Sequence, residues 1–338
     1  MITQTKQNGS AILLTTILFL GAGCTSSTEV VKPFSGAPPS AEDISTSTED
    51  VSTMADDVRL QFAADDGIRV VQASNPGAKI NDDGTVLLMY EDRQQRGNWI
   101  QTSGEDTDWL VFEGPERVKE LGDFRAMRLP DGTFRSYGMD ATKGVQGGDL
   151  TSRSSVDGVT FTADKGLRYS VQAGDKGSMG VFDFFLDSAG GVVMTYVGDL
   201  YGANNLRRAY STDNGVTFTF EQTDILGDVK AQARGQRGTN VDQKVYPLPD
   251  GRFWMITMRQ GSVYSFISED DGVTWTAEGL LLEPADFADL GIGSLHDPVM
   301  VFLPDGRARM YVTGAEKGGA TNPDVLQHIV SATTESNW

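Results

Sequence analysis

Ser211–Phe218 (STDNGVTF) and Ser268–Trp275 (SEDDGVTW) share one pattern, in which Ser, Asp, Gly, Thr and an aromatic residue recur at the same spacing. A third copy, Ser154–Phe161 (SSVDGVTF), has Val156 at the position of the aspartate. Ser and Asp side chains bond to nearby backbone N–H groups in tight turns, and the aromatic ring can pack between strands. A motif copied in this way predicts one supersecondary unit repeated about an axis or along a solenoid.

Each copy follows a second repeating element, an apolar strand, a glycine turn and another apolar strand. Successive turn glycines are 48, 58, 61 and 55 residues apart, at Gly84, Gly132, Gly190, Gly251 and Gly306. An aromatic residue follows each glycine after 24 to 32 residues, at Trp109, Phe161, Phe218, Trp275 and Trp338. This period is near that of a four-stranded propeller blade. The sequence predicts an all-β fold, a five-bladed β-propeller of four-stranded blades.

The two ends of the repeat region predict how the ring closes. The fifth unit stops at Trp338, before an outermost strand, whereas Val58–Ala63 (VRLQFA) precedes the first complete unit and has no partner there. We expect this N-terminal segment to supply the missing strand, because an open ring would leave sheet edges exposed. The propeller domain is therefore predicted over residues 58–338.

The first 57 residues have a different character. Residues 1–24 read as a signal peptide, with Lys6 before the apolar stretch Ala11–Leu20 and Cys24 at the end. This segment resembles the lipobox of bacterial lipoproteins, which implies lipidation of Cys24 and an exported cell-envelope protein, compatible with outer-membrane sorting. Incorporation of labelled palmitate would test this prediction. Residues 25–57 are rich in Ser, Thr, Pro and acids, and we expect a disordered tether.

Composition narrows the choice of partners. The net charge of −19 argues against nucleic acid, because phosphate binding needs basic surface. Cys24 is the only cysteine, so the propeller has no disulfide. We expect a monomer whose only contact with a membrane is the lipid anchor.

Three aspartates occupy one repeated address. Counting eight residues back from the turn aspartate of a blade gives Asp123, Asp242 and Asp297, while blade one has Asn75 and blade three has Gly180 or Val181. Innermost strands start on one face of a propeller, so these side chains should point into a common axial funnel. Two carboxylates across a pocket are the equipment of glycoside hydrolysis. Backbone capping, or simple inheritance of the repeat, would explain the same positions without chemistry.

Further polar residues are candidates for the same site. Asp183 lies in an apolar strand, where burial raises a carboxyl pKa and suits a general acid. We expect His296, beside Asp297, to bind a sugar hydroxyl, act as acid or hold a metal-bound water, and an acidic funnel could hold Ca²⁺. No other cofactor is expected. The remaining candidates for substrate binding or catalysis follow second strands or carry a guanidinium: Asp92, Asp140, Asp199, Glu316, Arg125, Arg237 and Arg259.

The Ser-x-Asp-x-Gly-x-Thr turns resemble the Asp boxes (BNR repeats) of the sialidase superfamily, over roughly residues 58–338. In that superfamily the boxes mark a propeller and lie far from the catalytic face. The blade-one segment Ser74-Asn75-Pro76-Gly77 has Asn where sialidases have an arginine, which departs from their pattern.

Five blades and strand-start aspartates, including His296-Asp297-Pro298, are more similar to the arabinanase/fructosidase group of glycoside hydrolases. That resemblance implies base, orienting and pKa-tuning roles for Asp123, Asp242 and Asp297, with Glu316 or Asp183 as the acid. Asn75 departs from this pattern as well. The leading hypothesis is a glycoside hydrolase that uses funnel carboxylates on a carbohydrate substrate. The alternatives are a non-catalytic glycan- or protein-binding propeller and an exo-sialidase.

Overall fold

The computed structural model describes residues 60–118, 126–139, 149–158, 160–175, 177–198, 205–226, 240–318 and 325–335. The predicted signal peptide, Cys24 and the tether lie outside the described residues. So do five predicted site residues and the last aromatic residue of the repeat: Asp123, Arg125, Asp140, Asp199, Arg237 and Trp338. Among the residues described, no helix is long and apolar enough to cross a membrane.

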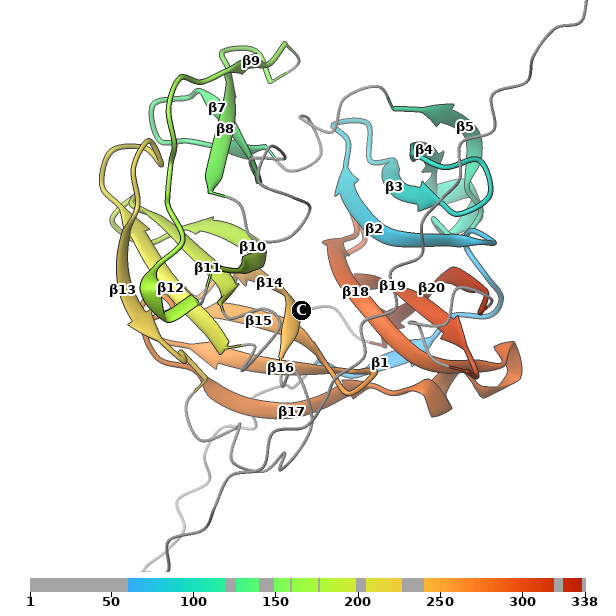
Figure 1. Ribbon diagram of the computed structural model, residues 1–338. Helices are drawn as coiled ribbons and strands as arrows, with labels where there is room; N and C mark the ends of the chain where they lie inside the picture. Colours follow the sequence, from blue (N-terminus) through green and yellow to red (C-terminus); the bar gives the residue numbers. More distant parts are fainter. Residues whose placement is uncertain are drawn as a thin grey trace, which may run out of the picture. The chain divides into compact units, whose positions relative to one another are not determined.

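Five four-stranded antiparallel sheets form the blades of a propeller, as the repeat predicted (Figure 1). Blade one has β2 (Ala73–Ile80), β3 (Val86–Asp92), β4 (Asn98–Ser103) and β5 (Glu113–Arg117). Blade two has β6 (Met127–Arg128), β7 (Phe134–Met139), β8 (Leu150–Ser155) and β9 (Thr162–Ala163). Blade three has β10 (Met179–Leu186), β11 (Val192–Gly198), β12 (Asn205–Ser211) and β13 (Thr219–Thr223). Blade four has β14 (Val241–Pro247), β15 (Phe253–Arg259), β16 (Ser262–Ser268) and β17 (Thr276–Leu282).

Blade five combines both ends of the domain. Its strands are β18 (Ile292–Phe302), β19 (Ala308–Glu316), β20 (Gln327–Thr334) and the N-terminal β1 (Phe62–Ala64). In the part of the chain that the structure describes, the short 3₁₀ helices η1 (Glu105–Thr107), η4 (Ala173–Asp175) and η6 (Pro284–Leu290) lie in connections between strands. The first strands of blades line the axis, since β18 contacts both β2 and β14, and β14 contacts β10.

Apolar second strands explain why the sheets stack. Every residue of β11 (VVMTYVG) is buried, and the first five residues of β15 (FWMIT) are buried as well. Sheets covered on both faces need such continuous apolar runs. The five turn glycines join the first and second strands with φ between 81° and 91°. This left-handed backbone is accessible to glycine without a steric penalty, so the repeated glycine has a local cause.

The Ser-x-Asp turns form local hydrogen-bond cages. Asp213 accepts hydrogen bonds from Ser211 Oγ (2.7 Å) and the Thr217 backbone N–H (2.8 Å), and Gly215 N–H donates to Ser211 Oγ (2.9 Å). The Ser268–Trp275 turn repeats these contacts through its own Ser, Asp, Gly and Thr.

The first copy of the motif needs a correction, because its turn is one residue shorter. Val156 does not stand in for the missing aspartate. Instead Asp157 accepts from Ser155 Oγ (2.7 Å) and from the Thr160 N–H (2.8 Å). The same hydrogen bonds form, but Ser155 and Asp157 take the places that the motif alignment gave to Ser154 and Val156.

The predicted closure of the ring is confirmed. β1 pairs antiparallel with β20, with Phe62 opposite Thr334 and Ala64 opposite Ala332. The strand lies slightly later than the predicted Val58–Ala63. Just after it, Asp65 accepts hydrogen bonds from Ser331 Oγ (2.6 Å) and Thr333 Oγ1 (2.8 Å). The first and last described strands of the propeller are therefore joined by both backbone pairing and side-chain contacts.

Candidate active site

The repeated strand-start address is a β-bulge. In each of β2, β10, β14 and β18 one extra residue interrupts the pairing with the following strand. The first residue of each bulge has a positive φ: Asn75 (53°), Val181 (47°), Asp242 (55°) and Asp297 (50°). Asn and Asp adopt this left-handed conformation readily, whereas a β-branched residue such as Val181 is an outlier. A bulge redirects a side chain from the regular face of a strand, and here it does so at equivalent points around the axis.

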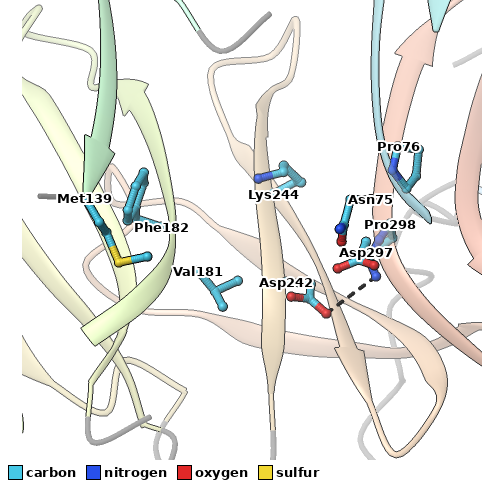
Figure 2. Close-up of a pocket in the computed structure, with 9 residues that line it drawn as sticks. All are labelled: Asn75, Pro76, Met139, Val181, Phe182, Asp242, Lys244, Asp297 and Pro298. Carbon is cyan, nitrogen blue, oxygen red and sulfur yellow. Dashed lines mark hydrogen bonds between the residues drawn. The ribbon is translucent and has the colours of Figure 1, made fainter. Parts of the chain in front are cut away.

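These four residues line one axial pocket with a cavity volume of about 140 Å³. The other lining residues are Pro76, Met139, Phe182, Lys244 and Pro298. Figure 2 shows Met139, Val181 and Phe182 on one side, with Asn75, Asp242 and Asp297 on the other. The pocket thus has an apolar wall from blades two and three and a polar wall from blades one, four and five.

Asp242 and Asp297 form the chemical centre of the polar wall. The Asp297 backbone N–H donates to Asp242 Oδ2 over 3.4 Å (Figure 2). The pKa of Asp242 is raised to about 7. Burial is the largest cause, and the negative charge of Asp297 is the second. Asp242 keeps part of its surface on the pocket although it lies deep among protein atoms. Near neutral pH this side chain can therefore hold a proton beside an acidic neighbour, as a general acid must.

A threonine that sequence reasoning missed connects two walls of the pocket. Thr313, buried in β19, donates its hydroxyl to Asp297 Oδ2 (3.1 Å) and accepts the backbone N–H of Asn75 (3.0 Å). Asn75 in turn donates its side-chain N–H to Glu91 Oε2 (2.8 Å). The departure at Asn75 is thus part of a hydrogen-bond chain from blade one to blade five. In the sequence, the only sign of this role for Asn75 is that it occupies the same repeat position as Asp242 and Asp297.

Asp183 lines an adjoining cavity of about 320 Å³ and not the carboxylate pocket itself. One of its oxygens lies 3.3 Å from Lys244 Nζ, and the other accepts the Val245 backbone N–H at 2.8 Å. The expected apolar surroundings are therefore incomplete, because the neighbouring blade provides an ammonium group and an N–H donor. Lys244 lines both cavities together with Pro76 and Phe182, so this ion pair lies where the two cavities adjoin.

Gln243, the second residue of the blade-four bulge, fixes blades three and four together. Its side chain is fully buried and donates from Nε2 to the carbonyl oxygens of Val181 (2.6 Å) and Thr195 (3.1 Å). Holding the Val181 carbonyl helps to explain how a β-branched residue keeps a left-handed backbone. The bulges of two blades are in this way positioned by one amide.

Two other predicted candidates, His296 and Glu316, lie outside the pocket lining. His296 Nε2 lies 2.9 Å from Ser294 Oγ, and burial lowers the pKa of His296 against the opposing effect of Asp297. Glu316 lies 3.3 Å from His328 Nε2, and His328 Nδ1 accepts the Gln72 N–H at 3.2 Å. Glu316 thus contacts His328 outside the pocket lining, and the acid role that the resemblance implied for it stays a prediction.

The remaining described candidates also lie away from the pocket lining. Arg259 stacks over the Tyr264 ring, 5.6 Å from its centroid. Asp92 accepts the backbone N–H groups of Gln94 (2.8 Å) and Gln95 (2.7 Å) in the β3–β4 turn. Among the described residues, no group of three or more His, Cys, Asp or Glu side chains could hold a metal ion.

The raised pKa of Asp242 predicts how stability depends on pH. The carboxyl has a reference pKa of 3.8 and a folded pKa of about 7, so folding takes up a proton between these values. Wild-type stability should therefore fall as pH rises through this interval. We expect Asp242→Asn to match the wild type near pH 4 and to exceed it by about 1–3 kcal/mol at pH 8, because the buried charge is gone. Denaturant unfolding across this range would measure the difference.

Asp270→Asn is the matched control, with the opposite sign. Burial would raise the pKa of Asp270, but hydrogen bonds from Thr274 and Ser268 outweigh it, and the net pKa is lowered. This variant should be less stable than the wild type at pH 8, with the difference shrinking in acid. An Asp242→Asn variant less stable than the wild type at pH 8 would show that Asp242 is stabilised as a charge.

Solved structures share the propeller fold. An endo-1,4-beta-xylanase from Bacteroides thetaiotaomicron superimposes with a TM-score of 0.56 and 12% identity, covering 78% of this chain and 92% of that chain. An endo-arabinase from the same organism gives 0.53 and 12%, covering 83% of this chain and 98% of that one. An alpha-L-arabinofuranosidase from Lactobacillus brevis gives 0.53 and 12%, covering 80% and 94%.

These neighbours are five-bladed propeller glycoside hydrolases, and at this identity the likeness shows the fold alone. It agrees with the architecture implied by the resemblance to the arabinanase/fructosidase group. No protein-family profile and no curated protein sequence matches the chain.

Proposed function

We propose that this propeller is a glycoside hydrolase whose proton transfer is carried out by Asp242 and Asp297. The observation that carries the proposal is the position of both carboxyl groups in one pocket, with the pKa of Asp242 raised to about 7 in part by Asp297. Asp242 can then hold a proton near neutral pH beside a second carboxyl group. Two carboxyl groups with different protonation states are what cleavage of a glycosidic bond requires.

The roles follow from the surroundings of each carboxyl. Asp242 donates its proton to the glycosidic oxygen, so that the departing sugar leaves as a neutral alcohol. Asp297, oriented by Thr313, either attacks the anomeric carbon or takes a proton from an attacking water. These two routes give retention and inversion of configuration respectively. The anomeric configuration of the first product, observed by NMR, distinguishes them.

The two walls of the pocket suit a sugar ring. The apolar side formed by Met139, Val181 and Phe182 can cover ring C–H groups, while the polar side meets hydroxyl groups. The fold neighbours named above, a xylanase, an arabinase and an arabinofuranosidase, support a carbohydrate as the substrate class.

The bulge residues also support a second candidate, a glycan-binding propeller without hydrolysis. Four described bulges place a residue in the pocket, and at two of them this residue is uncharged, Asn75 and Val181. The pocket therefore has two aspartates where the repeat could place four. An exo-sialidase has less support. Sialidases have an arginine at the position of Asn75. Here the cationic residue among the described lining residues is Lys244, and it is already paired with Asp183.

Incubation of the purified protein with a panel of aryl glycosides and polysaccharides tests the proposal. We expect release of sugar from at least one neutral or acidic glycan, with activity falling as pH rises above about 7, because Asp242 must then lose its proton. Glycan binding by calorimetry without sugar release at any pH would favour the binding function.

A further inference from the structure

A third cavity, here called the rim cavity, has a wall that is hydrogen-bonded to a lining residue of the carboxylate pocket. Its volume is about 490 Å³, and it lies between the β3–β4 hairpin and the start of β20. Its polar lining residues are Gln72, Glu91, Asp92, Arg93, Arg96 and Gln327. Backbone contacts fix its walls, since Arg93 N–H donates to the Gln72 carbonyl (2.9 Å) and Gln72 N–H donates to His328 (3.2 Å).

The rim cavity is linked to the pocket through one hydrogen bond. Glu91 lines the rim cavity and accepts the side-chain N–H of Asn75, which lines the pocket. The two cavities are therefore separated by one pair of hydrogen-bonded side chains, which brings the rim cavity within reach of a glycan held in the pocket. The distance between the two sites is that of neighbouring side chains and not of opposite faces.

In the rim cavity the two carboxylates have hydrogen-bond partners, whereas the two guanidinium groups have none in the part of the chain that the structure describes. Asp92 bonds to two backbone N–H groups of the hairpin turn, and Glu91 is bonded to Asn75. Arg93 and Arg96 are exposed, and neither guanidinium has a hydrogen-bond or ion-pair partner among the described residues. In a chain with 47 acidic and 28 basic residues, two unpaired guanidinium groups lining one cavity are conspicuous. Their planar N–H fork matches carboxylate and sulfate oxygens.

We propose that the rim cavity binds an anionic group, a carboxylate or a sulfate, on a glycan held in the carboxylate pocket. This inference rests on the proposed function and makes it more specific, because the substrate becomes an acidic glycan. Arg93 and Arg96 bind the anion, and Asp92 orders the turn that carries them. The acid–base chemistry at Asp242 and Asp297 is separate from this recognition.

Calorimetry with the full-length Asp297→Asn protein tests the proposal without turnover. The probes are trigalacturonate, a sulfated galactotriose and neutral galactotriose. We expect an anionic trisaccharide to bind about 5- to 30-fold more tightly than the neutral one at low salt, since each exposed charge pair contributes modestly and a bidentate pair contributes more. The preference should shrink in 0.5 M NaCl. Comparison of the two anionic probes distinguishes a carboxylate from a sulfate ligand.

Adding Arg93→Gln and Arg96→Gln should abolish the preference and leave binding of the neutral trisaccharide unchanged. Arg128→Gln, which removes an exposed arginine of β6 outside both cavities, is the charge-matched control and should retain the preference. Equal affinity for all three probes, or a preference that survives the double substitution, would overturn the proposal. Hydrolysis of neutral and acidic glycans at equal rates would also overturn it while the proposed function stands. Arginine-dependent binding without hydrolysis by the wild type would leave the rim site standing and remove the enzyme.

Discussion

Asp297→Asn should lower kcat by at least a hundred- to ten-thousand-fold while the fold remains intact. General acid–base assistance is worth roughly this much, and loss of a nucleophile costs more. Asparagine tolerates the φ of 50° at this position and can still accept the Thr313 hydroxyl, so the bulge should survive. Asp242→Asn should give a loss of similar size. Steady-state kinetics together with a thermal melt of each variant would measure both effects.

Asp213→Asn is the control for this prediction. Asp213 belongs to a Ser-x-Asp turn at the end of the ring where the turn glycines lie, opposite the strand starts that form the pocket. Its loss should lower stability, because the hydrogen bonds of Ser211 and Thr217 depend on it, and should leave kcat nearly unchanged. An active wild type whose kcat survives replacement of both Asp242 and Asp297 would place the chemistry elsewhere.

Removal of the closing strand should have the largest effect on stability. Deleting residues 1–64 removes β1 and the apolar contacts of Leu60, Phe62 and Ala64 with the blade-four and blade-five core. It also leaves the edge of β20 unpaired. We expect a loss of several kcal/mol and a Tm lower by on the order of 10 °C or more, from the lost apolar burial and strand pairing.

Two comparisons make the closure prediction specific. Deleting residues 1–55 keeps β1 and should leave the Tm unchanged. In the full chain, Ala63→Pro removes a backbone donor opposite Thr333 from an exposed position and should lower the Tm by a smaller amount. Equal melting temperatures for the 1–55 and 1–64 deletions would contradict closure by β1.

The blade number and the funnel address were predictable because both depend on local chemistry. A glycine with φ near 81–91° is needed in each turn, and the Ser-x-Asp cages close within a few residues. The distance along a strand from turn to bulge is nearly constant, so counting back from the turn identifies Asn75, Asp242 and Asp297 from the sequence. The same reasoning failed at Ser155 and Asp157, where a turn shortened by one residue uses different positions.

The sequence by itself determined the repeat, the closing strand and the residues that face the axis, since each is specified by contacts between near neighbours or by periodicity. Tertiary structure alone decided which of them interact. Asp242 meets Asp297 from the next blade, and Asp183 meets Lys244 from the blade after its own. Those pairings depend on how adjacent blades pack and on the bulges that turn each side chain inward. Burial and charge at the resulting contacts set the protonation of Asp242, which no spacing along the chain encodes.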